Sequence, residues 1–169
     1  MTAATICATR RVRLGPINLN SATVIAIAKA AADSLKRVHL ELGGKAPVIV
    51  FDDADLEAVV ATLTETGYYN SGQDCTAPCR VIAGANVFDD FVTSLTSSVS
   101  QIKTGDPLLD ETAMGPVVSG EQLARVQGMV DRAREGAEIV VGGERPERAG
   151  AYYAPTVIAG ADQKSEIIQ

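Results

Sequence analysis

The sequence predicts an α/β fold built on a largely parallel sheet, because segments patterned like strands alternate with segments patterned like helices. Short apolar runs at 47–51 and 80–83 are typical of buried strands, and apolar residues recur at spacings of three and four in the segments that follow them. With 169 residues and 46% hydrophobic content, the chain can bury the core of one domain.

The N-terminal part predicts one helix and one strand. Residues 1–20 have no clear period and predict an irregular segment. A helix is expected from Ser21, a candidate N-cap, because small or apolar residues then recur every three or four positions. These residues are Val24, Ala28, Ala31 and Leu35. Residues 38–42 alternate between apolar and polar types, which predicts a strand that ends at a double glycine and contains His39 as a buried, hydrogen-bonded histidine.

Strands and helices continue to alternate through the rest of the chain. A buried strand at 47–51 is expected to lead, through N-cap candidates at 52–55, into a helix that stops near Gly67. The strand at 80–83 is followed by a helical pattern whose phenylalanines are expected in the core. A loop at 103–116, a helix from Ser119 to Gly136, and strands at 139–141 and 152–158 complete the prediction.

Charge and composition exclude several classes of function. The net charge of -6 and the pI near 4.8 argue against binding to nucleic acid or to an anionic membrane, because such binding relies on clustered Lys and Arg. No apolar stretch approaches the roughly 18 to 20 residues that span a bilayer, and no secretory signal pattern is seen, so a soluble, cytoplasmic chain is expected. The three cysteines are expected to be reduced thiols, and no metal site is expected at Cys75 and Cys79 because His39 is distant in sequence.

Two residues supply the reactive groups that acyl-enzyme chemistry needs. Cys75 follows the turn-prone run 71–74, between a predicted helix and a predicted strand, and its thiolate can attack a carbonyl. Glu41 lies 34 residues earlier, at the carboxyl end of its predicted strand, where open α/β folds place their sites. Its carboxylate can take a proton from the water that releases the acyl group. The alternatives are a buried, inert Cys75 and a surface ion pair for Glu41, and Cys79 is interpreted as a core or supporting residue.

The segments His39-Leu-Glu-Leu-Gly-Gly-Lys45 and Gly72-Gln-Asp-Cys75 together resemble the NAD(P)-dependent aldehyde dehydrogenases, whose general base lies in E-L-G-G-K and whose nucleophile lies in G-Q-x-C. The resemblance covers about residues 23–169. It implies a partial enzyme, with the end of the cofactor-binding domain at 21–45 and the first part of the catalytic domain at 46–169. In this resemblance Cys75 is the nucleophile and Glu41 is the general base.

The same resemblance implies NAD as the cofactor, with NADP as the alternative. The residues that it places near the cofactor are Leu42, Gly43 and Gln122. Gln122 also completes the pattern Ser119-x-x-Gln122, a capping box, so a purely structural role is equally open.

The residues around the nucleophile favour a substrate class. Gly-Tyr-Tyr-Asn at 67–70, with Cys79-Arg80 after the nucleophile, resembles the aminobutyraldehyde dehydrogenases, which implies 4-aminobutyraldehyde or a related amino-aldehyde derived from putrescine. Asp74 places a carboxylate beside the thiol, which disfavours the thiolate unless a cation offsets it. The ammonium group of an amino-aldehyde is such a cation. The alternative is an outward-facing loop aspartate.

Parts of the family pattern do not occur in the chain, namely a Gly-Ser-x-x-x-Gly loop and an E-x-F-G-P segment. We therefore expect the 169-residue chain alone to bind NAD poorly and to turn over little, while the parent enzyme is expected to be a homo-oligomer. Two other functions stay open. One is a non-catalytic fragment that docks on full-length subunits through exposed sheet edges, and the other is a cysteine esterase that works without NAD.

Overall fold

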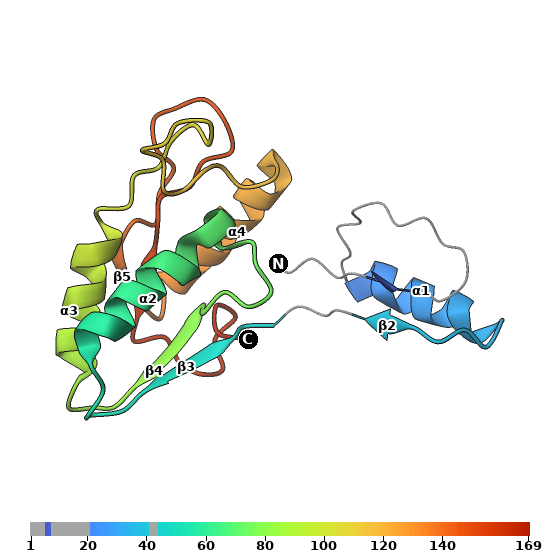
Figure 1. Ribbon diagram of the computed structural model, residues 1–169, viewed down its shortest axis with the longest axis horizontal. Coiled ribbons are helices and arrows are strands. Elements are labelled where there is room, and N and C mark those ends of the chain that lie inside the picture. Colours follow the sequence, from blue (N-terminus) through green and yellow to red (C-terminus); the bar gives the residue numbers. More distant parts are fainter. Residues whose placement is uncertain (1–5, 8–20, 41–43) are drawn as a thin grey trace. The chain divides into compact units, whose positions relative to one another are not determined.

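The computed structural model describes residues 6–7, 21–40 and 44–169. The chain divides into two compact units (Figure 1). Unit 1 comprises residues 1–44 together with Gln73–Cys75, and unit 2 comprises Lys45–Gly72 and Thr76–Gln169.

Unit 1 is built around one helix and one small strand pair. Helix α1 (Ser21–Ala32) confirms the predicted helix. Strands β1 (Ile6–Cys7) and β2 (His39–Leu40) pair antiparallel. Val24 of α1 is buried, and partly buried apolar residues from α1 and from the β2 region pack against it.

Two predictions for unit 1 are wrong. Leu35 was expected on the apolar face of the helix, but α1 ends at Ala32 and Leu35 lies in the following turn, with φ 51° and 93% of its surface exposed. His39 was expected to be buried and is exposed. Side chains alternate between the two faces of a strand, so Val38 and Leu40 pack toward α1 while His39 lies on the other face.

A βαβ unit forms the first half of unit 2. Strands β3 (Pro47–Val50) and β4 (Arg80–Ala83) pair in parallel, with Pro47 opposite Arg80. They are connected by α2 (Leu56–Tyr68) and by the short 3-10 helix η1 (Tyr69–Gly72). Asp55 caps α2 as predicted, because its carboxylate accepts a hydrogen bond from the backbone N–H of Ala58 at 3.1 Å. The parallel pair and its connecting helix confirm the predicted α/β fold.

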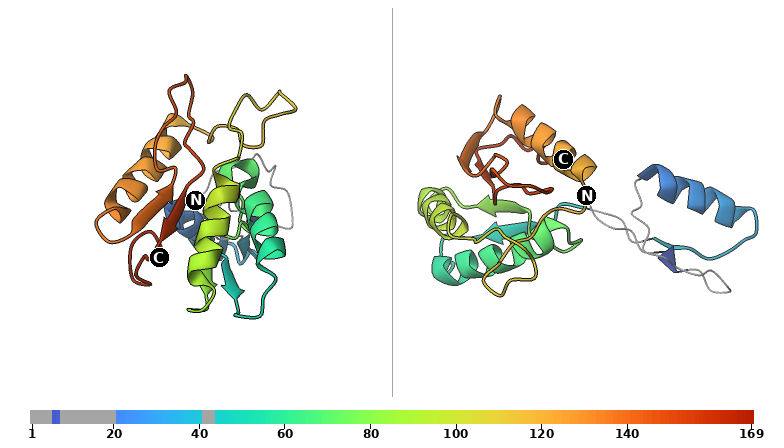
Figure 2. Two further views of the ribbon diagram at one scale, coloured as in Figure 1. Left: turned by 90° about the vertical axis from the view of Figure 1, so that its left-hand side faces the viewer. Right: turned by 90° about the horizontal axis from the view of Figure 1, so that it is seen from above.

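The main core lies where α2 and α3 (Phe88–Val99) pack on the β3–β4 pair (Figure 2). Its buried residues are Val60, Leu63, Phe91, Leu95, Val99 and Val157. Phe91 is only 4% exposed, as predicted, whereas Phe88 is 38% exposed. Phe88 is the first residue of α3 and does not belong to this cluster.

The β3–β4 pair is covered on one face in the part of the chain that the structure describes. Val48 and Val81 pack against the core, whereas Ile49 is 61% exposed and Phe51 is 69% exposed. Ile82, which is paired with Ile49, is exposed as well. The prediction of a buried strand at 47–51 is therefore wrong for alternate residues, because the residues that pack against α2 and α3 all lie on the same face.

The second half of unit 2 carries a helix and an antiparallel strand pair. Helix α4 (Gly120–Ala133) lies within the predicted range, and β5 (Glu138–Val141) pairs with β6 (Val157–Ala159). The predicted strand at 152–158 is shorter than expected, because β6 begins only at Val157. Tyr152 and Tyr153 are buried but lie in the segment that precedes it. A second buried cluster joins α4 to this pair, and its members are Val117, Leu123, Val130 and Tyr153. Among the described residues, no helix combines the length and apolarity needed to cross a bilayer.

Candidate active site

The backbone just before Cys75 adopts a rare conformation. Asn70, Ser71 and Gly72 have successive φ values of 49°, 58° and 71°, which lie in the left-handed region. Glycine adopts this region freely and asparagine tolerates it, but serine does so at a cost in free energy. The Ser71 hydroxyl donates a hydrogen bond to the Gly115 carbonyl at 2.8 Å, and this contact holds the turn on the 103–116 loop. The sequence predicted a turn here but not its anchor.

Cys75 lies in a turn and is exposed. A buried Cys75, one of the alternatives, is therefore not what the structure shows, and the role of Cys75 as nucleophile stays a prediction. Asp74 is half-buried beside it and takes part in an interaction of its own. Cys79 was predicted to be core or supporting, and a core position is wrong because Cys79 is exposed. Ala77 occupies the buried position in this segment instead.

Gln122 is buried in the first turn of α4, with 8% of its surface exposed. Its backbone N–H donates to the Ser119 hydroxyl at 3.1 Å, which is the N-cap bond that the capping-box alternative requires. The bond uses the backbone of Gln122, so it does not decide the role of the side-chain amide. Gln122 belongs to unit 2, whereas Asp74 and Cys75 belong to unit 1. Glu41, Leu42 and Gly43 lie outside the described residues.

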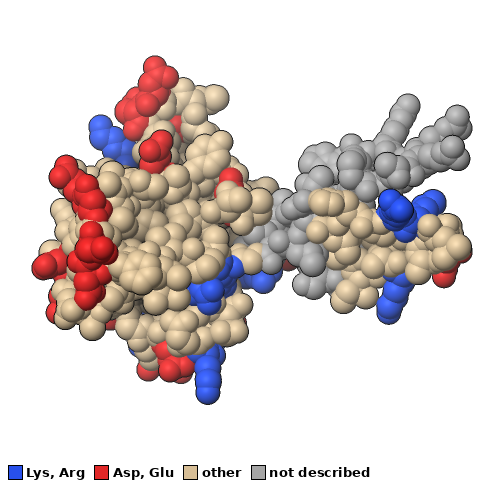
Figure 3. Space-filling model, turned by 60° about the horizontal axis from the view of Figure 1, so that its bottom comes forward, with Lys and Arg blue, Asp and Glu red and all other residues tan. Residues whose placement is uncertain are grey.

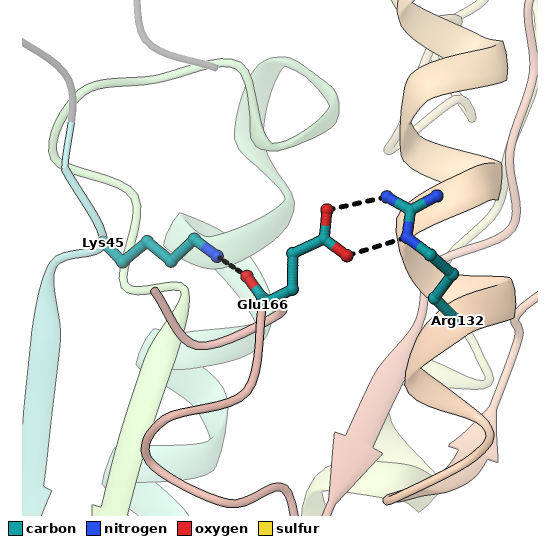
Figure 4. Close-up of polar contacts among 3 residues, drawn as sticks. All are labelled: Lys45, Arg132 and Glu166. Carbon is teal, nitrogen blue, oxygen red and sulfur yellow. Dashed lines mark hydrogen bonds and ion pairs between the residues drawn. The ribbon is translucent and has the colours of Figure 1, made fainter.

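A polar cluster that the sequence did not predict surrounds Glu166 (Figure 4). Arg132 of α4 donates to both carboxylate oxygens of Glu166, each at 2.7 Å. Lys45, just before β3, donates through Nζ to the backbone carbonyls of Ile167 at 2.5 Å and Glu166 at 3.4 Å. Burial lowers the pKa of Lys45, and the neighbouring Cys79 and Glu166 partly oppose that shift. The cluster ties the last residues of the chain to β3 and to α4.

Unit 2 contains a cavity of about 400 Å³. Its lining includes β4, β6, part of α3 and Cys79, but none of Asp74, Cys75 and Gln122. Tyr68, at the end of α2, also lines it and donates its hydroxyl to the Thr156 carbonyl at 3.0 Å. Burial raises the pKa of Tyr68.

Charged side chains are unevenly spread over the surface. On the face drawn in Figure 3, Asp and Glu side chains gather along one edge of unit 2.

Among the residues that the structure describes, no group of three or more His, Cys, Asp or Glu side chains is arranged to hold a metal ion.

Comparison with known proteins decides the family. The sequence profile described as "Aldehyde dehydrogenase family" matches residues 3–169. The chain belongs to the aldehyde dehydrogenase family. The match begins at residue 3, so it extends further toward the N-terminus than the resemblance over about residues 23–169 predicted.

The names of relatives of this aldehyde dehydrogenase chain include several different aldehydes. A betaine aldehyde dehydrogenase of Cereibacter sphaeroides is 43% identical over 131 residues, which is 77% of this chain and 27% of the relative. The lactaldehyde dehydrogenase of Escherichia coli is 40% identical over 144 residues, which is 84% of this chain and 30% of the relative. The chain thus spans less than a third of the length of these relatives.

A solved structure supports the same fold. The betaine aldehyde dehydrogenase of Staphylococcus aureus in complex with NAD+ is 40% identical, with a TM-score of 0.84 over 88% of this chain and 30% of that one. The family, the partial coverage and the α/β fold of the sequence analysis are therefore confirmed.

Proposed function

We propose that this chain serves an NAD-dependent aldehyde dehydrogenase reaction, with Cys75 as the nucleophile and Glu41 as the general base. One observation carries the proposal. The Cys75 thiol is exposed directly after a left-handed turn that Ser71 anchors, and the chain belongs to the aldehyde dehydrogenase family. Unfavourable backbone conformations persist where the surrounding structure holds them, and they cluster at functional sites.

The proposed reaction begins with attack of the Cys75 thiolate on the aldehyde carbon. A C–S bond forms, and the carbonyl oxygen becomes an oxyanion for which the backbone N–H of Cys75 is a proposed donor. Loss of hydride from the same carbon leaves a thioester on Cys75. Glu41 then takes a proton from water, the water oxygen attacks the thioester, the C–S bond breaks and the acid leaves. One aldehyde, one NAD+ and one water give one carboxylic acid, one NADH and one proton.

NAD supplies the oxidant of this reaction when it is bound. Of the three residues proposed to contact it, the structure describes Gln122. A buried amide needs hydrogen-bond partners, and the capping bond at Ser119 uses only its backbone N–H. This fits a Gln122 side chain that binds a cofactor hydroxyl, and Leu42 and Gly43 are proposed to contact the cofactor through their backbone.

The proposed substrate is an aldehyde with a positive charge, such as 4-aminobutyraldehyde. Asp74 lies next to the nucleophile, and a substrate cation would offset the repulsion between its carboxylate and the thiolate. Betaine aldehyde, the substrate in the name of one relative, also carries a cationic nitrogen. The lactaldehyde relative shows that the family also takes an uncharged aldehyde, so the charge must be tested.

Thiol protection tests the nucleophile without requiring turnover. A reversible adduct between Cys75 and 4-aminobutyraldehyde should slow alkylation of Cys75 by iodoacetamide, read by peptide mass spectrometry, while Cys79 in the same chain is the matched control. Butyraldehyde should protect Cys75 less, and Asp74→Asn should remove that difference. Equal alkylation of Cys75 and Cys79 with and without aldehyde would refute the proposal.

A spectrophotometric assay tests turnover. We expect the 169-residue chain alone to form NADH from 4-aminobutyraldehyde slowly or not at all, and any rate should vanish in Cys75→Ser and survive in Cys79→Ser. A normal rate would show that the low-turnover prediction is wrong while supporting the chemistry. Hydrolysis of p-nitrophenyl acetate without NAD, lost in Cys75→Ser, would identify the esterase alternative. The homo-oligomeric parent enzyme stays a prediction.

A further inference from the structure

The segment that contains Cys75 is closed at its base by packing within unit 2. Gly67, near the end of α2, lies against Pro78, because a Cβ added to Gly67 would lie 3.6 Å from the Pro78 carbonyl oxygen. Gly72 folds back on the same helix end, since a Cβ added there would lie 3.6 Å from the Gly67 carbonyl oxygen. Ala77 is buried just before Pro78. Both ends of the segment 67–78 therefore have fixed positions in unit 2.

The 103–116 loop contains a segment that is held on both sides. At the base of the loop, the backbone N–H of Gly105 donates to the Met114 carbonyl at 3.0 Å. Beyond the loop, the N–H of Val117 donates to the Ala151 carbonyl at 2.9 Å. The side chains of Met114 and Val117 are both buried. The two residues between them therefore present their carbonyl groups from a rigid support.

The Ser71 hydroxyl connects the cysteine segment to this support. Its oxygen lies 2.8 Å from the Gly115 carbonyl oxygen and 3.3 Å from the Pro116 carbonyl oxygen. A hydroxyl has one hydrogen to donate, so the shorter contact is the main bond and Pro116 is the second acceptor. Both acceptors belong to the segment between Met114 and Val117. The hydroxyl therefore ties the left-handed turn at 70–72 to a part of unit 2 that is already held in place.

The hydrogen bond and the strain at Ser71 are similar in size. A serine in the left-handed region has a cost in free energy that glycine does not have, and the net contribution of one hydrogen bond is of the same order. Without the hydroxyl, nothing among these contacts offsets the cost at residue 71. The turn can then open, and the change passes along the covalent chain through Gln73 and Asp74 to Cys75.

We propose that Ser71 is a positioning residue for the nucleophile. Its hydroxyl holds the turn at 70–72, and the turn fixes the direction in which the backbone continues to Cys75. Ser71 itself does not contact the aldehyde. Its effect is large because a reacting group displaced by about 1 Å can lose roughly a hundredfold in rate. This role rests on the proposed function, since it requires Cys75 to be the nucleophile.

Two variants remove the hydroxyl in different ways. Ser71→Ala loses the hydrogen bond and keeps the backbone cost, whereas Ser71→Gly loses the bond but adopts the left-handed region freely, so that it folds even if Ser71→Ala does not. Glycine permits the turn without fixing it. Ser100→Ala is the matched control, because the Ser100 hydroxyl also donates to a backbone carbonyl, that of Ser97, at 2.8 Å. Circular dichroism and urea midpoints compare the folding of all three variants.

Limited proteolysis measures opening of the turn without any chemistry at Cys75. Chymotrypsin cleaves after tyrosine, and Tyr69 is exposed just before the turn. Because cleavage follows the population of locally open chains, loss of the bond should speed cleavage after Tyr69 about fivefold in Ser71→Ala. Ser71→Gly should change in the same direction, and Ser100→Ala should not change. Unchanged cleavage in both Ser71 variants would overturn the proposal, and so would equally fast cleavage in Ser100→Ala.

Protection by aldehyde measures the effect on the nucleophile. The concentration of 4-aminobutyraldehyde that halves iodoacetamide alkylation of Cys75 should rise at least about tenfold in both Ser71 variants and stay unchanged in Ser100→Ala. Alkylation of Cys75 without aldehyde should change less than roughly twofold, because it needs only an accessible thiolate. A purely structural Ser71 would lower the urea midpoint and leave this concentration unchanged.

The native chain and the variants separate the two possible failures. If 4-aminobutyraldehyde protects Cys75 equally well in the native chain and in both Ser71 variants, the positioning role is overturned and the proposed function stands. If the aldehyde does not protect Cys75 in the native chain, the proposed function is contradicted, and the role of Ser71 is overturned with it.

Discussion

Unit 1 and unit 2 bury their apolar residues to different extents. In the described part of unit 1, Val24 is buried while Ile25 on the same helix is more than half exposed. In unit 2, two buried clusters draw residues from α2, α3, α4 and β6. The helices of unit 2 bury one apolar stripe each, whereas α1 is rich in small and apolar residues on all sides. A helix that is apolar all round needs cover on every side to be stable.

The difference separates stability from chemistry. The core of unit 2 supports the βαβ unit, the cavity and the loop that anchors Ser71. Cys75, the proposed nucleophile, belongs to unit 1. The proposed nucleophile thus belongs to the unit with less buried apolar surface in its described part.

Core truncation should produce the largest contrast between the units. Phe91→Ala is expected to lower the free energy of unfolding of unit 2 by about 3 to 5 kcal/mol, because Phe91 is almost fully buried in the main core. Val24→Ala removes less buried surface and should cost about 1 to 2 kcal/mol, in unit 1 only. Urea unfolding followed by circular dichroism measures both. Phe88→Ala is the matched control with a smaller loss, and equal losses at Phe88 and Phe91 would contradict this account of the core.

The contact of Tyr68 tests how the second half of unit 2 is tied to α2. Tyr68→Phe leaves the Thr156 carbonyl without its hydrogen bond. The free energy of unfolding should therefore fall by about 1 to 2 kcal/mol at neutral pH. Tyr69→Phe is the control, because Tyr69 is exposed.

Tyr68 should also give unit 2 an alkaline pH dependence. Burial raises the pKa of the folded Tyr68 above the unfolded value of about 10, so the folded chain keeps its proton while the unfolded chain releases it. The contribution of Tyr68 to the stability of unit 2 is therefore full below about pH 10, and it falls as the pH rises toward the pKa of the folded state. Urea midpoints at pH 7 and pH 11 should therefore fall further for the native chain than for Tyr68→Phe. Parallel falls would contradict the burial of this hydroxyl.

Loss of the N-cap of α4 is expected to lower the free energy of unfolding by about 1 kcal/mol. Ser119→Ala removes the acceptor for the backbone N–H of Gln122, whereas Ser119→Asp restores an acceptor and should recover most of the loss in a urea titration. Gln122→Ala keeps this bond and should weaken NAD binding, measured by calorimetry, more than Ser119→Ala does. If both variants change NAD binding equally, the role of Gln122 is confined to the helix.

Replacement of Glu166 should change the free energy of unfolding least among these variants. The hydrogen bonds from Arg132, and then the charges of Arg132 and Lys45, lower the pKa of Glu166, but the pair is solvent-exposed. Its contribution is present above the unfolded pKa near 4.5 and is lost as the pH falls through the folded pKa. The stability difference between the native chain and Glu166→Gln should therefore shrink between pH 7 and pH 3. The exposed Glu147→Gln is the control, and a difference that grows in acid would contradict the pairing.

Local patterns predicted most helices of this fold. The N-cap at Asp55, the N-cap at Ser119 and the buried Phe91 follow from short-range sequence rules, because caps and apolar stripes depend on neighbours within one or two turns. The exposed Ile49 and Phe51 did not follow, because an apolar run looks the same whether one or both faces of a strand are covered. The exposure of His39 depended in the same way on which face of the strand met α1.

The candidate site divides in a similar manner. Cys75, Asp74 and Gln122 were found from motifs, whereas Ser71 and Tyr68 were missed because their partners are 44 and 88 residues away in sequence. Lys45 was missed as well, since its partners lie near the end of the chain.

The sequence by itself determined the family, the reactive thiol and the order of strands and helices, because each depends on residues that are close together along the chain. The tertiary structure alone decided that the Ser71 hydroxyl meets the Gly115 carbonyl, which lies 44 residues further along the chain. It also decided which face of the β3–β4 pair is covered. Such features depend on contacts between segments far apart in sequence, and the periodicity of any one segment carries no information about what lies opposite it.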